Sequence, residues 1–385
     1  MKMNKTRKEM ARTTLFDCGE DQYYLPDLKT RLPLRQHSGV ARTLGETRAW
    51  IKGFPEIRNW APFCAPRGDI DLWLAQGFAD VWISHQFTCG NVDTFRIICD
   101  LGGWMVMTDD VHSAPGPFRD ADEATRNRAL DRAIEILNGD GQEFDRNQPS
   151  SDTADVLVLG RCLSDVWYRL CRSAPPSIRA RIARALQGTL ESWKAEASDR
   201  GSGRCLTLDE FLERRDVYVG IDVDFPVLEF MLGIDLHSEL EAHADAFSKI
   251  WRILRRYTSL VNDLYSFRKE YMAGKDLTNS IAAQCNMEHV RISDAVRKVV
   301  DLAESAEEEF IACREQFIAT HPELTSGLLR YLECLGDIAS GTAFYTRCSP
   351  RYHGVDHDWS EIGGGLVTID TERTIIHPWV EEATR

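Results

Sequence analysis

Apolar residues recur at helical spacing through most of this chain. Side chains three and four positions apart lie on one face of an α-helix, so the pattern predicts helices that each bury one side. Strand-type alternation between turn signals is scarce, and no internal repeat is evident. We therefore expect an all-α protein. The predicted helical stretches are 71–112, 155–197, 206–234, 239–274, 289–318 and 321–347.

A chain of 385 residues, 43% of them hydrophobic, can bury a large core, and its length alone would permit more than one domain. Turn formers concentrate in 138–152 and 198–203, which we interpret as surface connections within one domain, 21–352. Residues 1–20 are rich in Lys and Arg and carry no apolar signal stretch, so we expect a disordered basic tail. We expect residues 353–385 to form an irregular tail that can fold over the opening of a site.

Charge, hydropathy and cysteine usage exclude several classes of function. A net charge of −14 argues against a nucleic-acid partner, whose phosphates would repel the surface. No segment approaches the ~20 consecutive apolar residues that a membrane span needs. The 11 cysteines are scattered without a Cys-x-x-Cys pair, so we expect reduced thiols in a cytoplasmic protein. The common nucleotide-binding and hydrolase motifs are absent from the sequence.

Asn262, Ser266 and Glu270 are spaced four residues apart within one predicted helix. Positions i, i+4 and i+8 fall on one narrow face, so an amide oxygen, a hydroxyl and a carboxylate point the same way. This oxygen-only set suits Mg²⁺ and leaves coordination positions for water and a substrate phosphate. Soft metals would require Cys or His ligands. Taken alone, the same face is equally compatible with a solvated stripe.

Residues 262–270 resemble the second metal motif of the class I terpene synthases of microbial type, Asn-Asp-x-x-Ser-x-x-x-Glu. In this family a Lys often precedes the final Glu, as Lys269 does here. An upstream apolar run ends in Asp109-Asp110, like the family's aspartate-rich motif. Adjacent buried carboxylates repel one another unless cations offset their charge. Ser113 stands where the family has an acidic residue, so the resemblance implies that Asp109, with Asp110 beside it, supplies this metal ligand.

Two further segments resemble the diphosphate-binding parts of the same family. Aligning Phe211 and Gly220 with a family segment puts Arg215 at the position of the diphosphate-sensing arginine. Its planar fork can hold two phosphate oxygens. Tyr218 takes the position that relays the movement of this arginine toward the substrate. The pair Arg351-Tyr352 is similar to the family's closing pair after the last helix.

The resemblance also implies a cavity lined by aromatic rings, whose faces stabilise a carbocation. We expect Trp82, Trp104 and Phe344 to line it and to bind substrate together with Tyr218, although ordinary core packing explains such rings equally well.

The resemblance implies a single-domain helical bundle around a central apolar cavity. Its expected reaction is Mg²⁺-dependent ionisation of an isoprenyl diphosphate, followed by cyclisation and diphosphate release. By analogy we expect farnesyl diphosphate and a sesquiterpene product, three Mg²⁺ ions that Mn²⁺ can replace, and a monomer or homodimer. The expected catalytic and diphosphate-binding residues are Asp109, Arg215, Lys269, Arg351 and Tyr352.

Two alternatives remain open at this point. A chain-elongating isoprenyl synthase would share the fold, but it normally carries two aspartate-rich motifs. A helical binding protein that has lost catalysis would account for Ser113.

Overall fold

The structure, a computed structural model, describes residues 22–54, 57, 71, 74, 79–113, 123–139, 154–202, 206–272, 278–353 and 364–368. The predicted tail 1–20 lies outside the described residues. So do the side chains of Asp110 and Ser113, although their backbone forms the end of a helix.

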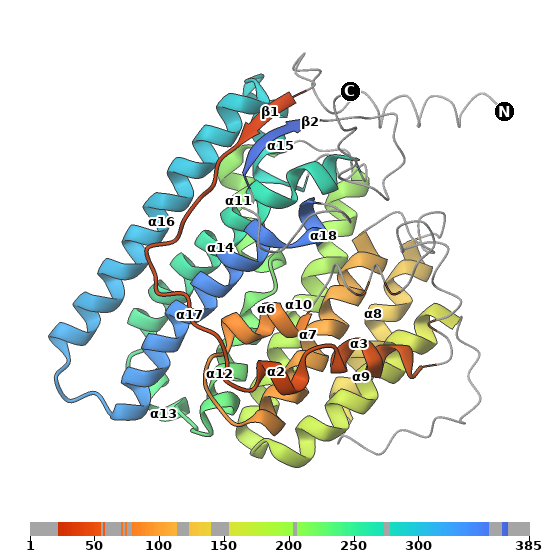
Figure 1. Cartoon of the computed structure of the whole chain (residues 1–385), viewed down its shortest axis with the longest axis vertical. Coiled ribbons are helices and arrows are strands. Elements are labelled where there is room, and N and C mark those ends of the chain that lie inside the picture. The colour runs from red at the N-terminus through yellow and green to blue at the C-terminus, as the bar shows by residue number, and fades with distance from the viewer. Residues whose placement is uncertain are drawn as a thin grey trace.

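Nearly all of the described chain is helical, which confirms the predicted all-α class (Figure 1). The α-helices are α2 (Val40–Thr43), α3 (Glu46–Lys52), α6 (Ala79–Gln86), α7 (Val92–Ser113), α8 (Glu123–Asn138), α9 (Ala154–Ser173), α10 (Pro176–Ser202), α11 (Leu208–Tyr218), α12 (Asp224–Leu232), α13 (His237–Ala242), α14 (Ala244–Met272), α15 (Ser280–Glu288), α16 (Ile292–Thr320), α17 (Ser326–Cys348) and α18 (Pro350–His353). A short 3-10 turn, η3 (Ile221–Val223), lies between α11 and α12.

The long helices form two groups that meet over a common core. Helices α14, α16 and α17 run side by side along one flank, and α7, α8, α9 and α10 form the other (Figure 1). Fully buried side chains pack between the helices, including Trp104, Tyr257 and Tyr331. Apolar faces at helical spacing explain this packing, because each helix must cover one stripe against its neighbours.

Several predicted stretches are divided in the structure by short backbone breaks. Stretch 71–112 breaks between α6 and α7, where Gly90 has φ +90° and a Cβ would lie 2.6 Å from the Met231 carbonyl oxygen. Stretch 206–234 breaks at Gly220, which has φ +77°. Such left-handed backbone favours glycine. The break after α9 comes before Pro175, where a following proline disfavours helix.

Helix α11 has a well-defined start that sets its direction. The Thr207 hydroxyl accepts a hydrogen bond from the Glu210 backbone N–H (3.3 Å), and the Glu210 carboxylate accepts one from the Thr207 backbone N–H (3.0 Å). This reciprocal capping box satisfies two N–H groups that the helix itself leaves open. Because Gly220 ends the segment, Arg215 is carried on a short helix fixed at both ends.

Two short strands join distant parts of the chain. Strand β1 (Gln22–Leu25) pairs antiparallel with β2 (Gly365–Thr368), with Tyr23 opposite Val367 (Figure 1). Strand β2 falls inside the segment that was expected to be irregular, so that expectation is wrong for these four residues. Backbone pairing with the distant β1 explains the difference, because a four-residue strand carries little periodic signal of its own.

The segment after β1 is attached to the two helices that lead to the predicted metal and diphosphate motifs. The Tyr265 hydroxyl on α14 accepts a hydrogen bond from the Leu28 N–H (2.9 Å) and donates one to the Pro26 carbonyl (3.1 Å). Arg347 on α17 pairs with Asp27 (2.6 Å). No helix in the described ranges is both long enough and apolar enough to cross a membrane.

Candidate active site

Most of the predicted site residues line one cavity of about 140 Å³ between the two helix groups. The lining combines polar and charged side chains with aromatic and aliphatic ones. The lining includes Trp82, Asp109, Arg215, Tyr218, Asn262, Lys269, Glu270, Arg351 and Tyr352. The structure therefore brings together motifs from α6, α7, α11, α14 and α18 that are far apart in the sequence.

The two predicted metal motifs lie on opposite walls and are connected through α18. Arg351 donates a hydrogen bond from its guanidinium to the Asp109 carboxylate of α7 (2.8 Å). The adjacent Tyr352 accepts a hydrogen bond at its hydroxyl from the Asn262 amide of α14 (3.0 Å). Arg351 and Tyr352 are both buried, so these contacts form in partly desolvated surroundings. The closing pair thus contacts both walls of the cavity.

Arg215 reaches the same wall from α11. Its guanidinium donates to the Asn262 amide oxygen (2.7 Å) and to the buried Asp263 carboxylate (2.8 Å). Desolvation acts to lower the pKa of Arg215, but the charges of Asp263 and Glu270 outweigh it and the pKa lies above its usual value. Desolvation also raises the pKa of Asp263, to about 6, although the Arg215 charge opposes this shift. Arg215 is therefore a permanent cation beside the face of α14 that carries Asn262, Ser266 and Glu270.

The remaining members of that face, Ser266 and Glu270, differ in how they are satisfied. Glu270 accepts a hydrogen bond from the Asn279 amide (3.0 Å), which holds its carboxylate in place. Ser266 is 1% exposed, and its hydroxyl oxygen has no hydrogen-bond partner among the described residues. Buried hydroxyls are nearly always bonded, so an orphan between two oxygen ligands fits a metal-ligand role.

The donor set is suited to a hard divalent cation that is also bound by its substrate. No group of three His, Cys, Asp or Glu side chains within the described ranges is placed to hold a metal by itself. Asp109 on α7 and Asn262, Ser266 and Glu270 on α14 supply oxygen atoms only, and of these four residues Ser266 alone is not part of the cavity lining. Mg²⁺ prefers such ligands and keeps positions for phosphate oxygens. The residues present therefore fit the predicted metal.

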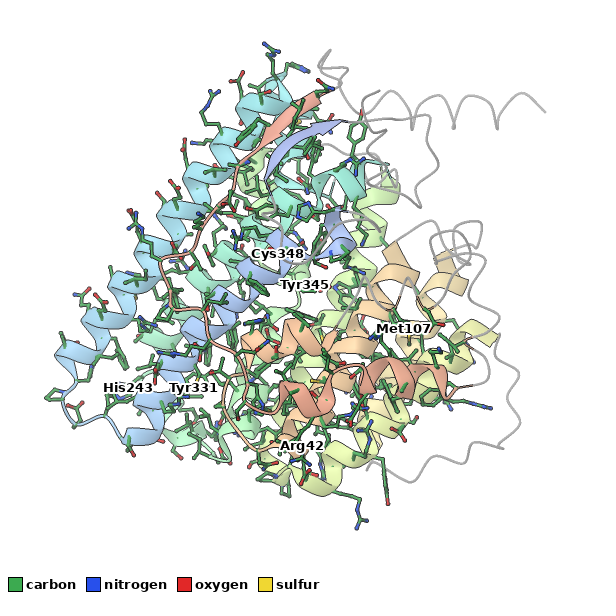
Figure 2. The ribbon with its side chains drawn as sticks, viewed as in Figure 1. Arg42, Met107, His243, Tyr331, Tyr345 and Cys348 are labelled. Carbon is green, nitrogen blue, oxygen red and sulfur yellow. The ribbon has the colours of Figure 1, made fainter. Side chains whose placement is uncertain are left out.

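Two predicted aromatic residues do not line this cavity. Trp104 is fully buried and donates its indole N–H to the Leu159 carbonyl (3.0 Å) in the core between α7 and α9. Phe344 packs on His85, with ring centroids 4.3 Å apart. The helix faces of both residues are turned toward neighbouring helices instead of the cavity. Tyr345, one position beyond Phe344 and near the centre of the molecule in Figure 2, lines the cavity.

A series of aromatic rings connects the cavity wall with the closing pair. Trp82 stacks on Tyr345 with a centroid distance of 5.4 Å, and Tyr345 meets Tyr352 edge-on at 6.0 Å. Lys269 lies over the Tyr352 ring at 5.9 Å. Such contacts hold ring faces toward the cavity and place cations beside them.

Sequence reasoning missed several residues that build the site. Asp263, which holds Arg215, follows Asn262 directly and could have been assigned from that position. Asn279 donates both to Glu270 and to the Asp263 carbonyl (2.9 Å), but it follows a segment with no periodic signal. Asp224 and Glu196 also line the cavity, and no spacing rule singles them out.

Comparisons with known proteins agree with this geometry. Residues 100–309 match the family model described as terpene synthase family 2, C-terminal metal binding. The chain is 22% identical over 338 residues to the bifunctional terpene synthase Agr4 of Cyclocybe aegerita, covering 87% of this chain and 90% of that protein. It is 24% identical over 342 residues to the sesquiterpene synthase Agr8 of the same organism, covering 88% of each.

Among solved structures, a variant of cucumene synthase superimposes with a TM-score of 0.68 at 20% identity. The match covers 85% of this chain and 100% of that one. At this identity the likeness shows the fold alone, and it confirms the predicted helical architecture.

Proposed function

Because the chain belongs to the terpene synthase family that its residues 100–309 match, we propose that it ionises an isoprenyl diphosphate and cyclises the resulting carbocation. The observation that carries this proposal is that Asp109 of α7 lines one cavity together with Asn262 and Glu270 of α14. Arg351 and Tyr352 contact both walls. A binding protein has no need for two oxygen-rich walls around an apolar chamber.

Asp109 with Asp110 on α7, and Asn262, Ser266 and Glu270 on α14, would hold Mg²⁺. The family arrangement has three ions, and Mn²⁺ can substitute. When bound, the divalent ions supply positive charge that stabilises the leaving diphosphate. The orphaned Ser266 hydroxyl is the observation on this chain that supports such binding.

Arg215, Lys269, Arg351 and Tyr352 supply the remaining diphosphate contacts. Arg351 now pairs with Asp109, and Arg215 with Asn262. Binding of the substrate with its cations would let both guanidinium groups exchange these oxygens for phosphate oxygens. Their charge stabilises the departing group as the C–O bond breaks and its electron pair moves to the diphosphate.

The cation then forms in the apolar part of the cavity, where Trp82, Tyr218 and Tyr345 present their side chains. Ring faces stabilise positive charge, and exclusion of water prevents early quenching. We propose farnesyl diphosphate as the substrate and a sesquiterpene as the product, supported by the likeness to the sesquiterpene synthase Agr8.

The test is incubation with geranyl, farnesyl or geranylgeranyl diphosphate and Mg²⁺, followed by gas chromatography with mass spectrometry. We expect cyclic C15 hydrocarbons or alcohols from farnesyl diphosphate, together with released diphosphate. Parallel reactions with added isopentenyl diphosphate detect chain growth, which would replace this proposal with an elongating synthase. Absence of Mg²⁺-dependent diphosphate release would instead favour the binding protein.

The same assay tests the metal face. Asn262→Leu removes one oxygen ligand, and we expect diphosphate release to fall by about 10²–10³-fold, the usual cost of losing one electrostatic stabiliser. Asn138→Leu is the matched control, because Asn138 is exposed on α8 and bonds only to Gln187 in the contacts described. Equal rates for the two variants would contradict the assignment of Asn262.

A further inference from the structure

Asp224, the first residue of α12, lines the active-site cavity without a partner for its carboxyl group. The residue is 9% exposed, and among the described residues no hydrogen bond or ion pair reaches its side chain. Buried carboxyl groups are normally paired, because burial without a partner costs free energy. An unpaired acid facing a chamber for hydrocarbon therefore calls for a chemical explanation.

The neighbouring acid, Asp222, provides an internal contrast. It pairs with Arg255 (2.6 Å) and lines a second, more open cavity of about 500 Å³. Tyr331, labelled in Figure 2, lines that second cavity as well. The start of α12 thus separates two cavities, with a paired acid on one side and an unpaired acid on the other.

Positions along helix α14 indicate how far Asp224 lies from the metal end of the cavity. Asn262 marks the metal end, and Arg255 lies about two turns earlier, roughly 10 Å along the axis. Asp222 is bound at the Arg255 level, and Phe225 stacks on Trp251 one further turn away (5.0 Å). Asp224 lies between these two positions in the chain, so it belongs to the level of Arg255 on α14 and not to that of Asn262.

The surroundings keep this carboxyl neutral near pH 7. Burial raises the pKa of Asp224 to about 8, and the Asp222 charge adds to the shift. Arg255, on the part of α14 that meets this segment, is paired with Asp222. A neutral carboxyl is a poor nucleophile, so a carbocation beside it is not trapped as an ester, yet it retains a proton to donate.

From this placement we propose that Asp224 is a catalytic proton-transfer residue that contacts the hydrocarbon of the substrate. The inference rests on the proposed function. After the first cation loses a proton to the released diphosphate, a neutral cyclic olefin remains in the cavity. The Asp224 O–H bond breaks and its proton bonds to one carbon of a C=C, leaving the other carbon cationic. The carboxylate then accepts a proton from an adjacent C–H bond, whose electron pair forms the new C=C.

This sequence is balanced without any further reactant. The olefin is isomerised, and Asp224 ends each cycle protonated as it began. Between turnovers its proton exchanges with solvent, which makes the step visible by isotope labelling.

The experiment is product analysis in D₂O with the full-length protein, Mg²⁺ and the accepted diphosphate. The wild-type product should contain one solvent-derived deuterium. In Asp224→Asn the deuterated product should fall by about 10²-fold or more, the usual contribution of a general acid. Diphosphate release should change little, because ionisation occurs at the other end of the cavity.

Asp294→Asn is the control, since it makes the same chemical change at an exposed position on α16 and should keep the deuterium in the product. Unlabelled wild-type product would overturn the inference while leaving the proposed function intact, and so would labelled product from Asp224→Asn. Absence of diphosphate release from the wild type would overturn both. Circular dichroism of Asp224→Asn verifies folding, which the similar size of Asn should preserve.

Discussion

The cavity has a metal end, which carries Asp109, Asn262 and Glu270, and a second end, here called the deep end, which carries Asp224. The three residues of the metal end each have a protein partner, whereas Asp224 has none among the described residues. Both ends carry acidic groups close to the same chamber. At the metal end, cationic and amide donors hold the oxygens ready. At the deep end, no cation or hydrogen-bond donor among the described residues offsets the charge of an ionised Asp224, so this carboxyl keeps its proton.

The contrast indicates that the two ends of the cavity are suited to different chemical steps. At the metal end, the paired oxygens can exchange guanidinium partners for metal ions, and the released guanidinium groups can then bind phosphate oxygens, so this end is suited to charge. The unpaired Asp224 carboxyl can exchange only a proton, so the deep end is suited to proton transfer to and from the carbon atoms of the substrate. Three variants break or sharpen this comparison, beginning with the largest expected effect.

Asp263→Asn tests how strongly the metal end depends on its pairing. The change leaves the buried Arg215 cation without its carboxylate, and we expect the free energy of unfolding to fall by about 3–5 kcal/mol. Urea denaturation measures it. The control is Asp216→Asn, whose partner Arg256 is partly exposed, with an expected loss of about 1 kcal/mol or less. Equal losses would show that the pairing at the metal end is not special.

Asp224→Asn tests the deep end through the pH dependence of stability. A carboxyl whose folded pKa of about 8 exceeds its unfolded value binds more protons in the folded state. Stability therefore falls as pH rises between about 4 and 8, by roughly 1.4 kcal/mol per pH unit from this group alone. Thermal denaturation between pH 5 and 7 should show a shallower decline for Asp224→Asn than for the wild type. The exposed variant Asp294→Asn should follow the wild type, and identical slopes for all three proteins would contradict the uncompensated burial.

Trp82→Leu probes the wall between the two ends, with the smallest expected effect. Loss of one ring face should raise the barrier for cyclisation by about 0.5–2 kcal/mol and change the product mixture. Product ratios by gas chromatography measure the change. Trp251→Leu is the control because Trp251 lines the second cavity, and it should leave the ratios unaltered. A change in Trp251→Leu of the same kind would remove the distinction between the cavities.

The face of α14 that carries the predicted metal ligands could be predicted from helical spacing, whereas Arg215 was predicted from the resemblance to the family segment. Helical spacing alone puts Asn262, Ser266 and Glu270 on one face, whatever the rest of the fold does. The partners of these residues depend on tertiary packing instead. The position of Asp263 next to Asn262 is visible in the sequence, but its pairing with Arg215 and the contact of Arg351 with Asp109 are visible only in the structure.

The helices themselves were predicted better than their ends. Helices α2, α3, α8, α15 and α18 fall outside every predicted stretch, and breaks such as Gly220 divide stretches that were predicted as continuous. Trp104 and Phe344 show a second limit. Periodicity identifies the buried side of a helix, but it does not distinguish a face that meets a cavity from one that meets another helix. Asp224 illustrates the same point, since the absence of a partner is visible only in three dimensions.

The pairing of β1 with β2 joins the first and the last described segments of the chain. Trimming the protein through Leu25 would withdraw the partner of Gly365–Thr368, although the two segments lie at opposite ends of the sequence. A cut past Asp27 would also release Arg347, four residues before Arg351, which contacts Asp109. Shortening the chain at 22–27 would therefore also remove contacts of residues 347–368.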